Sequence, residues 1–236
     1  MIKLTAAVTA LLTVAFAVSP VFTAPFSGFT PDQLPIPQVN PPVQPAGYAF
    51  AIWGVIYLWL IISAVFGLWK RSDDTASDWH NARKPLVVSL LIGVPWIPIA
   101  TASAIWASVT IILMAIGAIM ALINAPKRER WLFQAPVALY AGWLTAASWV
   151  SIATVFAGYG ILLGAFGWAI VGITGALIIA LLVFRQRSSA PEYFASIIWA
   201  LVGIIVANTG ENLTISILAA VGISLLTLTL IKHQRA

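Results

Sequence analysis

The sequence contains no cysteine, and only 8% of its 236 residues are charged. The absence of cysteine excludes disulfide bonds, thiolate metal sites and a cysteine nucleophile. Only two histidines are present, and His80 and His233 lie far apart in the sequence, which does not favour a metal site. A soluble domain carries about 25% charged residues, so the rarity of charge excludes a water-facing surface.

Apolar residues are in excess instead, at 61% of the sequence. This composition predicts an all-α, polytopic membrane helix bundle. The net charge is +5, but the Lys and Arg residues occur in short clusters between apolar runs. Orientation in a bilayer explains such clusters better than nucleic-acid binding does. We therefore expect membrane lipid as a partner and no nucleic acid.

The apolar runs are long enough for about eight transmembrane helices. Residues 47–69 contain no charge, and a helix of that length covers roughly 34 Å, enough for a hydrocarbon core of about 30 Å. Turn residues divide the longer runs. The expected helices occupy 1–22, 47–69, two within 85–126 that turn near 101–103, two within 132–184 that turn at 158–160, and two within 193–231 that turn at 208–212.

The first of these runs has two interpretations. Residues 1–22 fit either a first transmembrane helix or a secretory signal peptide, and we favour a retained helix because Pro25 would follow the cleavage site. Residues 23–46 contain seven prolines and one charge, Asp32, which predicts an extended loop that is either a lid or a connector.

Charge sets the expected orientation. Residues 70–84 are the most polar segment and are expected to form a solvated loop, so that no expected span contains Lys or Arg apart from Lys3 at the start of the first. With eight spans, every Lys and Arg falls on one side of the membrane together with both termini. The positive-inside rule makes this side the cytoplasm. We expect an integral protein of a bacterial cytoplasmic membrane.

Several aromatic motifs resemble those of a known family. The run from Pro45 to Trp53, PAGYAFAIW, with Tyr57 four residues on, is similar to the signature of the tryptophan-rich sensory protein family, also called TspO/MBR or translocator protein. Trp96-Ile97-Pro98 resembles a Trp-Ser-Pro motif in the family's third helix. Further similar positions, in what would be its fifth helix, are Pro136, Tyr140, Trp143, Ser148 and Trp149.

The resemblance has limits in content and extent. Ala46 stands where the family has a second proline, Tyr48 where it has tryptophan, and Gly93 where it has asparagine. The similar positions imply a TspO-like five-helix bundle over residues 1–156. Residues 157–236 would then form an additional three-helix transmembrane extension.

The resemblance implies a ligand-binding sensor or regulator rather than an enzyme. Its ligand would be a flat or elongated apolar molecule in an aromatic-lined cavity, with a tetrapyrrole such as porphyrin or heme, a sterol-like compound or another lipid as candidates, and with no required cofactor. A homodimer is a candidate assembly. The residues expected to line the cavity are Tyr48, Phe50, Trp53, Tyr57, Trp96, Tyr140, Trp143 and Trp149.

Residue chemistry leaves alternatives to this interpretation. Helical spacing alone also explains these rings as ordinary helix packing, in which case the chain is a structural membrane subunit. A transporter of an apolar metabolite is a third hypothesis. No combination of a nucleophile with a base, of metal ligands or of a cofactor motif predicts catalysis. Because the expected spans lack cations, a neutral ligand such as a carotenoid or quinone fits better than a porphyrin with its carboxylates.

Overall fold

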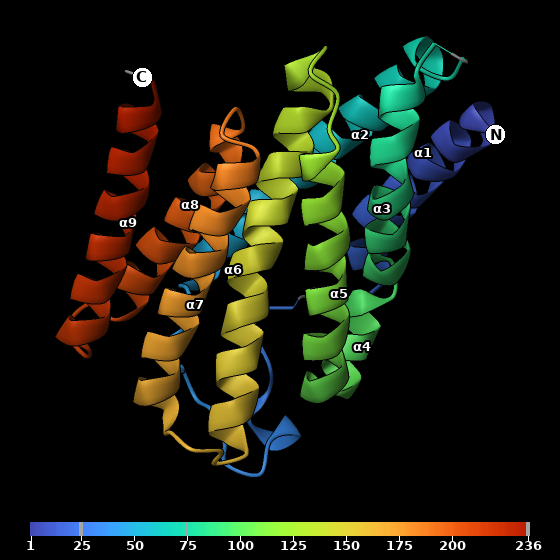
Figure 1. Cartoon of the computed structure of the whole chain (residues 1–236). Coiled ribbons are helices and arrows are strands. Elements are labelled where there is room, and N and C mark those ends of the chain that lie inside the picture. The colour runs from blue at the N-terminus through green and yellow to red at the C-terminus, as the bar shows by residue number, and fades with distance from the viewer. Residues whose placement is uncertain (24–25, 74, 235–236) are drawn as a thin grey trace.

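The computed structural model describes residues 1–23, 26–73 and 75–234. Ala24 and Pro25 of the proline-rich loop, Asp74 of the polar segment and Arg235 of the basic tail lie outside the described residues. Within them every regular element is a helix (Figure 1). The α-helices are α1 (Ile2–Val18), α2 (Ile52–Lys70), α3 (Ser77–Gly93), α4 (Trp96–Ala102), α5 (Ala104–Ile123), α6 (Gln134–Gly158), α7 (Ala165–Gln186), α8 (Pro191–Ala207) and α9 (Leu213–Gln234). The short 3-10 turns are η1 (Ser19–Phe22), η2 (Pro31–Gln33), η3 (Gly47–Ala51) and η4 (Arg130–Leu132).

These helices confirm the predicted polytopic bundle. Six of the described helices are long and apolar enough to cross a membrane, and the pair α3 and α4, bent by 44°, would make a seventh span. The remaining apolar helix, α8, has 17 residues, which is about 26 Å and slightly less than the usual hydrocarbon thickness. The helix ends fall at the predicted turns at Ser103, Gly158 and Asn208.

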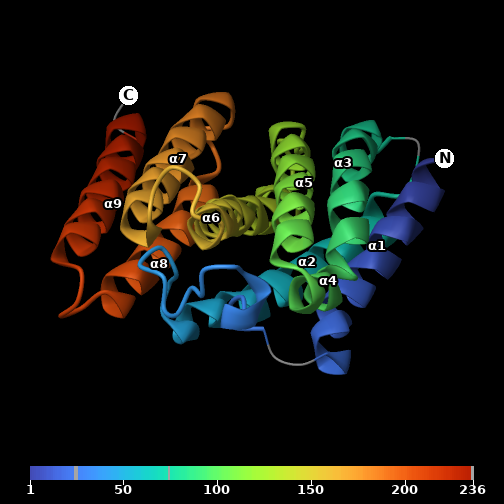
Figure 2. The same cartoon turned by 90° about the horizontal axis from the view of Figure 1, so that it is seen from below.

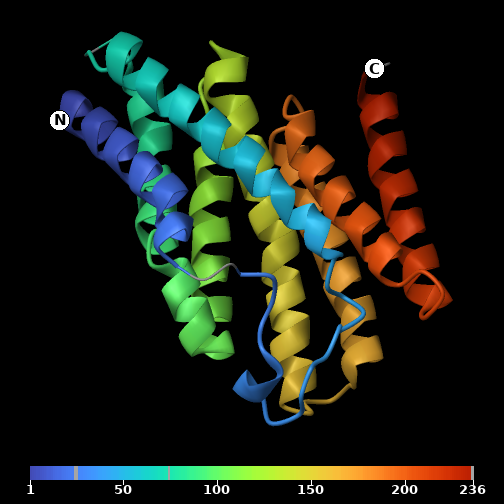
Figure 3. The ribbon, with the colours of Figure 1, turned by 180° about the vertical axis from the view of Figure 1, so that it is seen from behind.

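The helices form two rows around α6. Seen from below, α3, α5, α6, α7 and α9 follow one another in one row, and α1, α2 and α8 lie against it (Figure 2). α6 contacts α5, α7, α8 and α2, and Figure 3 shows α2 running obliquely across the bundle. In α6, 72% of the apolar span is buried inside the protein, against 22% in α1 and α9. The core is therefore centred on α6, and the outer helices keep large apolar faces for lipid.

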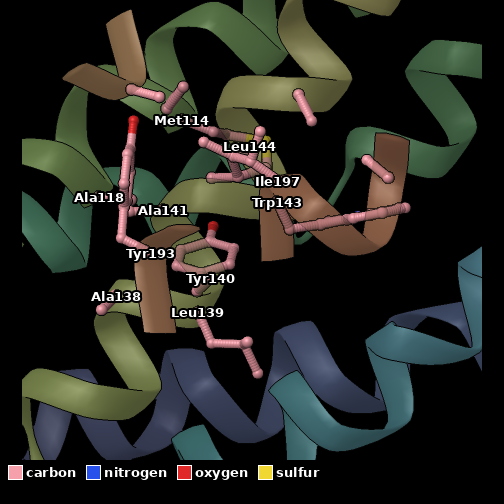
Figure 4. Packing of buried hydrophobic residues seen from close by; sticks show 14 of the residues in the cluster. Met114, Ala118, Ala138, Leu139, Tyr140, Ala141, Trp143, Leu144, Tyr193 and Ile197 are labelled. Atoms are coloured by element: carbon pink, nitrogen blue, oxygen red, sulfur yellow. The ribbon is translucent and has the colours of Figure 1, made fainter. Parts of the chain in front are cut away.

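Small residues allow this close packing around α6. At Gly142 an added Cβ would collide with Ser196 Oγ and the carbonyl oxygen of Tyr193. The backbones of α6 and α8 can approach this closely only because glycine has no side chain. Figure 4 shows Trp143 and Leu144 of α6 close to Met114 of α5 and Ile197 of α8, whereas Leu139 of α6 points away from this group.

Helix α3 corrects the prediction for residues 70–84. It begins at Ser77, so residues 77–84 are helical rather than a loop. The reason is an apolar stripe that Trp79, Ala82 and Leu86 form at helical spacing, and all three are buried. The same helix places Arg83 inside the protein at 2% exposure, which corrects the expectation that no span contains a cation. Its guanidinium donates to the Arg71 carbonyl oxygen, 2.7 Å away, close to one end of the bundle.

Polar contacts tie the helices together at this end. α1 begins and α9 ends there (Figure 1), and the described Lys and Arg residues lie at the same end. Glu129, in the α5–α6 connection, forms an ion pair with Arg71 and accepts a hydrogen bond from Trp79 Nε1 at 3.2 Å. The neighbouring Arg130 pairs with Glu192 at the start of α8. One connection thus holds α2 and α3 on one side and α8 on the other.

Candidate functional site

A cavity of about 220 Å³ lies among α1, α2, the bent pair α3–α4, α5 and α6. Residues of the proline-rich loop cover it, including Phe26, Phe29, Gln44 and Pro45. α8 also reaches the wall through Ala200. Other wall residues are Phe16, Ser19, Phe50, Trp53, Tyr57, Gly93, Trp96, Ile111, Met114, Trp143, Val150, Ser151 and Thr154.

Aromatic rings from α1 and α2 build one wall. Trp53 and Tyr57 are one helical turn apart, and their rings stack with centroids 5.2 Å apart and an angle of 20°. Phe16 of α1 meets both edge-on, at 5.7 Å from Trp53 and 5.2 Å from Tyr57. Such offset and edge-to-face contacts are the favoured ring geometries. The wall is therefore a fixed surface of ring faces and edges.

The adjoining part of the wall comes from α6 and from the 3-10 turn η3 that precedes α2. Trp143 lies 6.3 Å from Trp53 and 5.9 Å from Phe50, edge-on to both. Ser151 and Thr154 continue the α6 wall and are buried at 6% and 4% exposure. Thr154 Oγ1 donates back to the Val150 carbonyl oxygen, 2.8 Å away, as hydroxyls inside spans commonly do.

The bent pair of helices brings Trp96 to the cavity. α3 ends at Gly93 and α4 begins at Trp96, because Pro95 and Pro98 remove hydrogen-bond donors from the ladder. The Trp96 indole N–H donates to the Ala107 carbonyl oxygen, 3.1 Å away, and this bond fixes α4 to α5. Phe26 of the covering loop meets the Trp96 ring edge-on at 5.0 Å. The bend between α3 and α4 thus brings Trp96 to the cavity wall, where it contacts the covering loop.

The structure brings five of the eight predicted residues together on the cavity wall: Phe50, Trp53, Tyr57, Trp96 and Trp143. The other three do not line the cavity. Tyr140 is fully buried behind the wall, with its hydroxyl 2.9 Å from Ser89 Oγ. Trp149 lines a smaller neighbouring void. Tyr48 is 45% exposed and lies edge-on to Trp199 at 5.6 Å.

The sequence interpretation missed several wall residues. Phe16 belongs to a run that also fitted a signal peptide, so its ring was not assigned to a site. Phe26 and Phe29 are the aromatics of the proline-rich loop, and the expectation of a lid was the signal that could have found them. Ala200 carries no sequence signal, because a small residue in an apolar helix has no specific chemistry.

The cavity is apolar and uncharged, yet it offers hydrogen-bond donors. No Asp, Glu, Lys or Arg of the described chain lines it. Trp53 Nε1, Tyr57 Oη and Trp143 Nε1 belong to wall residues, and none of the three donates to an acceptor within the described residues. A ligand that carries an acceptor oxygen could supply the hydrogen bond that such a donor lacks. This arrangement suits an apolar molecule that carries a neutral acceptor such as a carbonyl oxygen.

The fold and this cavity together define a polytopic helical membrane protein with an aromatic-lined apolar pocket. A family model described as TSPO-like protein matches residues 3–232. The chain therefore belongs to the TSPO-like family, which confirms the resemblance inferred from the aromatic motifs. Comparisons with curated proteins and with solved structures give no match.

The family match extends over α7, α8 and α9 as well as over the preceding helices. The division into a five-helix bundle at 1–156 and an extension at 157–236 stays a prediction. The cavity itself draws on both segments, because Ala200 of α8 contributes to its wall.

Proposed function

We infer that this membrane protein is a receptor that holds a neutral, apolar small molecule in the aromatic cavity and acts as a sensor or regulator. The observation that carries this proposal is the wall of rings around an unfilled cavity, in which Phe16, Trp53, Tyr57 and Trp143 meet within 6.3 Å of a neighbour. Rings held in this way offer a ligand flat faces for stacking. A structural subunit would have no need to leave 220 Å³ unfilled, since interiors are otherwise close-packed.

The size of the cavity argues against a whole tetrapyrrole. A protein cavity of about 150 Å³ holds a benzene molecule, so 220 Å³ suits a single substituted ring. A macrocycle of four pyrrole rings would fit only if the covering loop moved. Porphyrin carboxylates would also find no cation on the wall, and an unpaired charge is costly to bury. The proposed ligand is therefore neutral, with a quinone-type ring as a representative.

We propose that the protein binds its ligand and does not catalyse a reaction. We also propose that the basic end of the bundle faces the cytoplasm. The positive-inside rule supports this orientation, because the described Lys and Arg residues gather where α1 begins. A bacterial cytoplasmic membrane and a homodimer stay predictions.

The test is saturable binding of a neutral benzoquinone to the purified protein, read from the quenching of tryptophan fluorescence. Trp53→Ala removes a stacked ring from the wall, and we expect it to weaken binding roughly tenfold, since an aromatic pair contributes about 0.5–1.5 kcal/mol beyond its buried area. Trp106→Ala is the matched control, because Trp106 is 63% exposed and does not line the cavity. Equal affinities in the two variants would place the quinone elsewhere and reject the proposed pocket.

A further inference from the structure

α1 buries one large side chain in the bundle, the phenyl ring of Phe16. The helix packs against α2 and α3 (Figure 2). Its other buried residues, Ala6, Thr9 and Thr13, are small. All four follow one another at helical spacing and therefore share one face. Phe16 is 4% exposed, and its ring is the aromatic contribution of α1 to the cavity wall.

The Phe16 ring fills the space where α1, α2, α3 and α6 meet beside the cavity. Besides its edge-on contacts with Trp53 and Tyr57 of α2, it lies 5.7 Å from the ring of Tyr140 of α6. On the side of α3 it meets Gly93, where an added Cβ would lie 2.8 Å from Phe16 Cε2 and 3.0 Å from Cδ2. The ring thus occupies the space that a side chain at position 93 would need.

The neighbours of this ring are held in place by contacts of their own. Tyr57 stacks on Trp53 at 5.2 Å, and the Tyr140 hydroxyl lies 2.9 Å from Ser89 Oγ. In a packed core the surrounding side chains relax only partly around a deleted group. Removing the phenyl group of Phe16 should therefore leave most of its space empty. Because Phe16 lines the cavity, that space would become part of the cavity.

The volumes indicate which ligands this change would admit. The cavity of about 220 Å³ suits a single substituted ring, since a protein cavity of about 150 Å³ holds a benzene molecule. The phenyl group of Phe16 has the size of one further ring. The cavity is partly open, so a second ring fused to the ligand would have to extend toward the open side, where fewer wall atoms enclose it. Without the Phe16 ring, it could lie between α1 and α3 instead.

We propose that Phe16, packed against Gly93, determines the specificity of the aromatic cavity by favouring a ligand with a single substituted ring over one with fused rings. This inference rests on the proposed function and narrows its ligand class to monocyclic molecules. It also assigns a role to Gly93, because a side chain there would displace the Phe16 ring.

The experiment compares two quinones on the full-length protein in lipid nanodiscs: a dimethylbenzoquinone, and the naphthoquinone that carries the same methyl groups and differs by one fused ring. Binding is read from the quenching of tryptophan fluorescence. Partition of each quinone into lipid is the same for every variant, so a change in the ratio of the two affinities reports the fit in the cavity.

The test variant is Phe16→Ala. We expect it to shift the ratio of affinities roughly tenfold toward the naphthoquinone, because the benzoquinone loses a ring contact while the fused ring gains space. Phe184→Ala is the matched control, since Phe184 is buried to a similar degree, at 6% exposure, and does not line the cavity. It should leave the ratio within about twofold of the wild type.

Gly93→Ala tests the same contact from α3. The new methyl group would push the Phe16 ring toward the cavity, so binding of the benzoquinone should weaken roughly threefold or more. In the background of Phe16→Ala the same substitution should weaken binding less, because the ring is absent. The other close atom is the terminal methyl carbon of Met114, at 3.0 Å, which belongs to a flexible side chain.

If Phe16→Ala does not fold, Phe16→Leu should shift the ratio in the same direction by roughly threefold. If the wild type binds the benzoquinone and the Phe16 variants leave the ratio unchanged, or Phe184→Ala shifts it equally, the specificity role of Phe16 is wrong while the proposed pocket stands. The same holds if the wild type binds only the naphthoquinone. If the wild type binds neither quinone, the proposed pocket is wrong, and this inference with it.

Discussion

The ion pair at the basic end of the bundle gives a stability prediction that can be worked from the structure. Glu129 has two roles there: it pairs with Arg71, and it accepts the hydrogen bond from Trp79 Nε1. The ion pair is partly open to water, with side-chain exposures of 32% for Arg71 and 19% for Glu129. Trp79, in contrast, is 1% exposed, and Glu129 accepts the hydrogen bond of its indole N–H.

Loss of the ion pair and loss of the hydrogen bond from Trp79 cost different free energies. A solvent-exposed ion pair contributes about 0–1 kcal/mol, whereas a buried donor left without an acceptor costs about 1–3 kcal/mol. We therefore expect Glu129→Ala to lower the free energy of unfolding by roughly 2–3 kcal/mol. For a chain of this length the melting temperature should fall by roughly 5–10 °C. Glu129→Gln keeps an acceptor oxygen for Trp79 and should cost no more than about 1 kcal/mol.

Acid should narrow the difference between the wild type and Glu129→Ala, because protonation removes the ion pair but leaves an acceptor oxygen for Trp79. The hydrogen bond from Arg71 is the main cause that holds the pKa of Glu129 below its usual value, and the bond from Trp79 adds to it. A carboxylate with a lowered pKa stabilises the folded state fully above its unfolded pKa, which is about 4.3 for Glu, and this contribution is lost as the pH falls through the lower folded pKa.

The assay is thermal unfolding in detergent, followed by circular dichroism over a series of pH values. Glu211→Ala is the control, because Glu211 is exposed and lies in the turn before α9. If Glu129→Ala melts at the same temperature as the wild type at neutral pH, the contacts of Glu129 with Arg71 and Trp79 do not stabilise the protein. A difference that persists undiminished in acid would refute the role of the ionised carboxylate.

Two further predictions concern helix packing and the cover of the cavity. Gly142→Ala should lower the free energy of unfolding by about 1–3 kcal/mol, because the new methyl group meets the Tyr193 carbonyl oxygen. Gly164→Ala is the control: the space around Gly164 is open, so the change should be less than about 0.5 kcal/mol. Denaturant or thermal unfolding compares the two variants, and equal stabilities would contradict the close approach of α6 and α8. Gln33→Ala removes the hydrogen bonds from Gln33 Nε2 to the Ala100 and Thr101 carbonyl oxygens at 2.8 and 3.2 Å, so a protease should cut the loop at residues 26–46 roughly 3–10-fold faster, for about 1 kcal/mol of lost tethering. Gln38→Ala is the control, because the Gln38 side chain donates to the nearby Ile36 carbonyl oxygen. An unchanged cleavage rate in Gln33→Ala would show that Gln33 does not hold the loop.

Much of the fold follows from local sequence. The charge-free runs and the turn residues between them predicted where the helices end, since each break at Ser103, Gly158 and Asn208 combines a loss of apolar character with residues that favour turns. The start of α3 was not predicted, because its polar residues masked an apolar stripe that becomes buried only against neighbouring helices. The same packing buries Trp79, which lies in the core although the residues around it in the sequence are polar.

The sequence likewise predicted some residues of the candidate site and missed others. Trp53, Tyr57 and Trp143 could be proposed from the sequence because the family resemblance implies them as cavity residues, and helical spacing puts Trp53 and Tyr57 on one face. Spacing does not determine which neighbour a face meets, so Tyr140 and Trp149 were expected on the cavity and lie behind it and beside it. The contributions of Phe16 and Ala200 depend on contacts between helices far apart in the chain.

By itself the sequence determined the class of this protein: its charge-free runs cannot be solvated by water and have to become helices in a bilayer, with their cationic ends together. It also determined the family, through aromatic motifs at fixed spacing along single helices. Only the tertiary structure decided which rings line the cavity, that the loop at residues 26–46 covers it, and that Asn208 at the end of α8 binds this loop at Pro42. These depend on how helices cross and how closely α6 packs against its neighbours, and such distances arise from contacts between residues that the chain order does not place together.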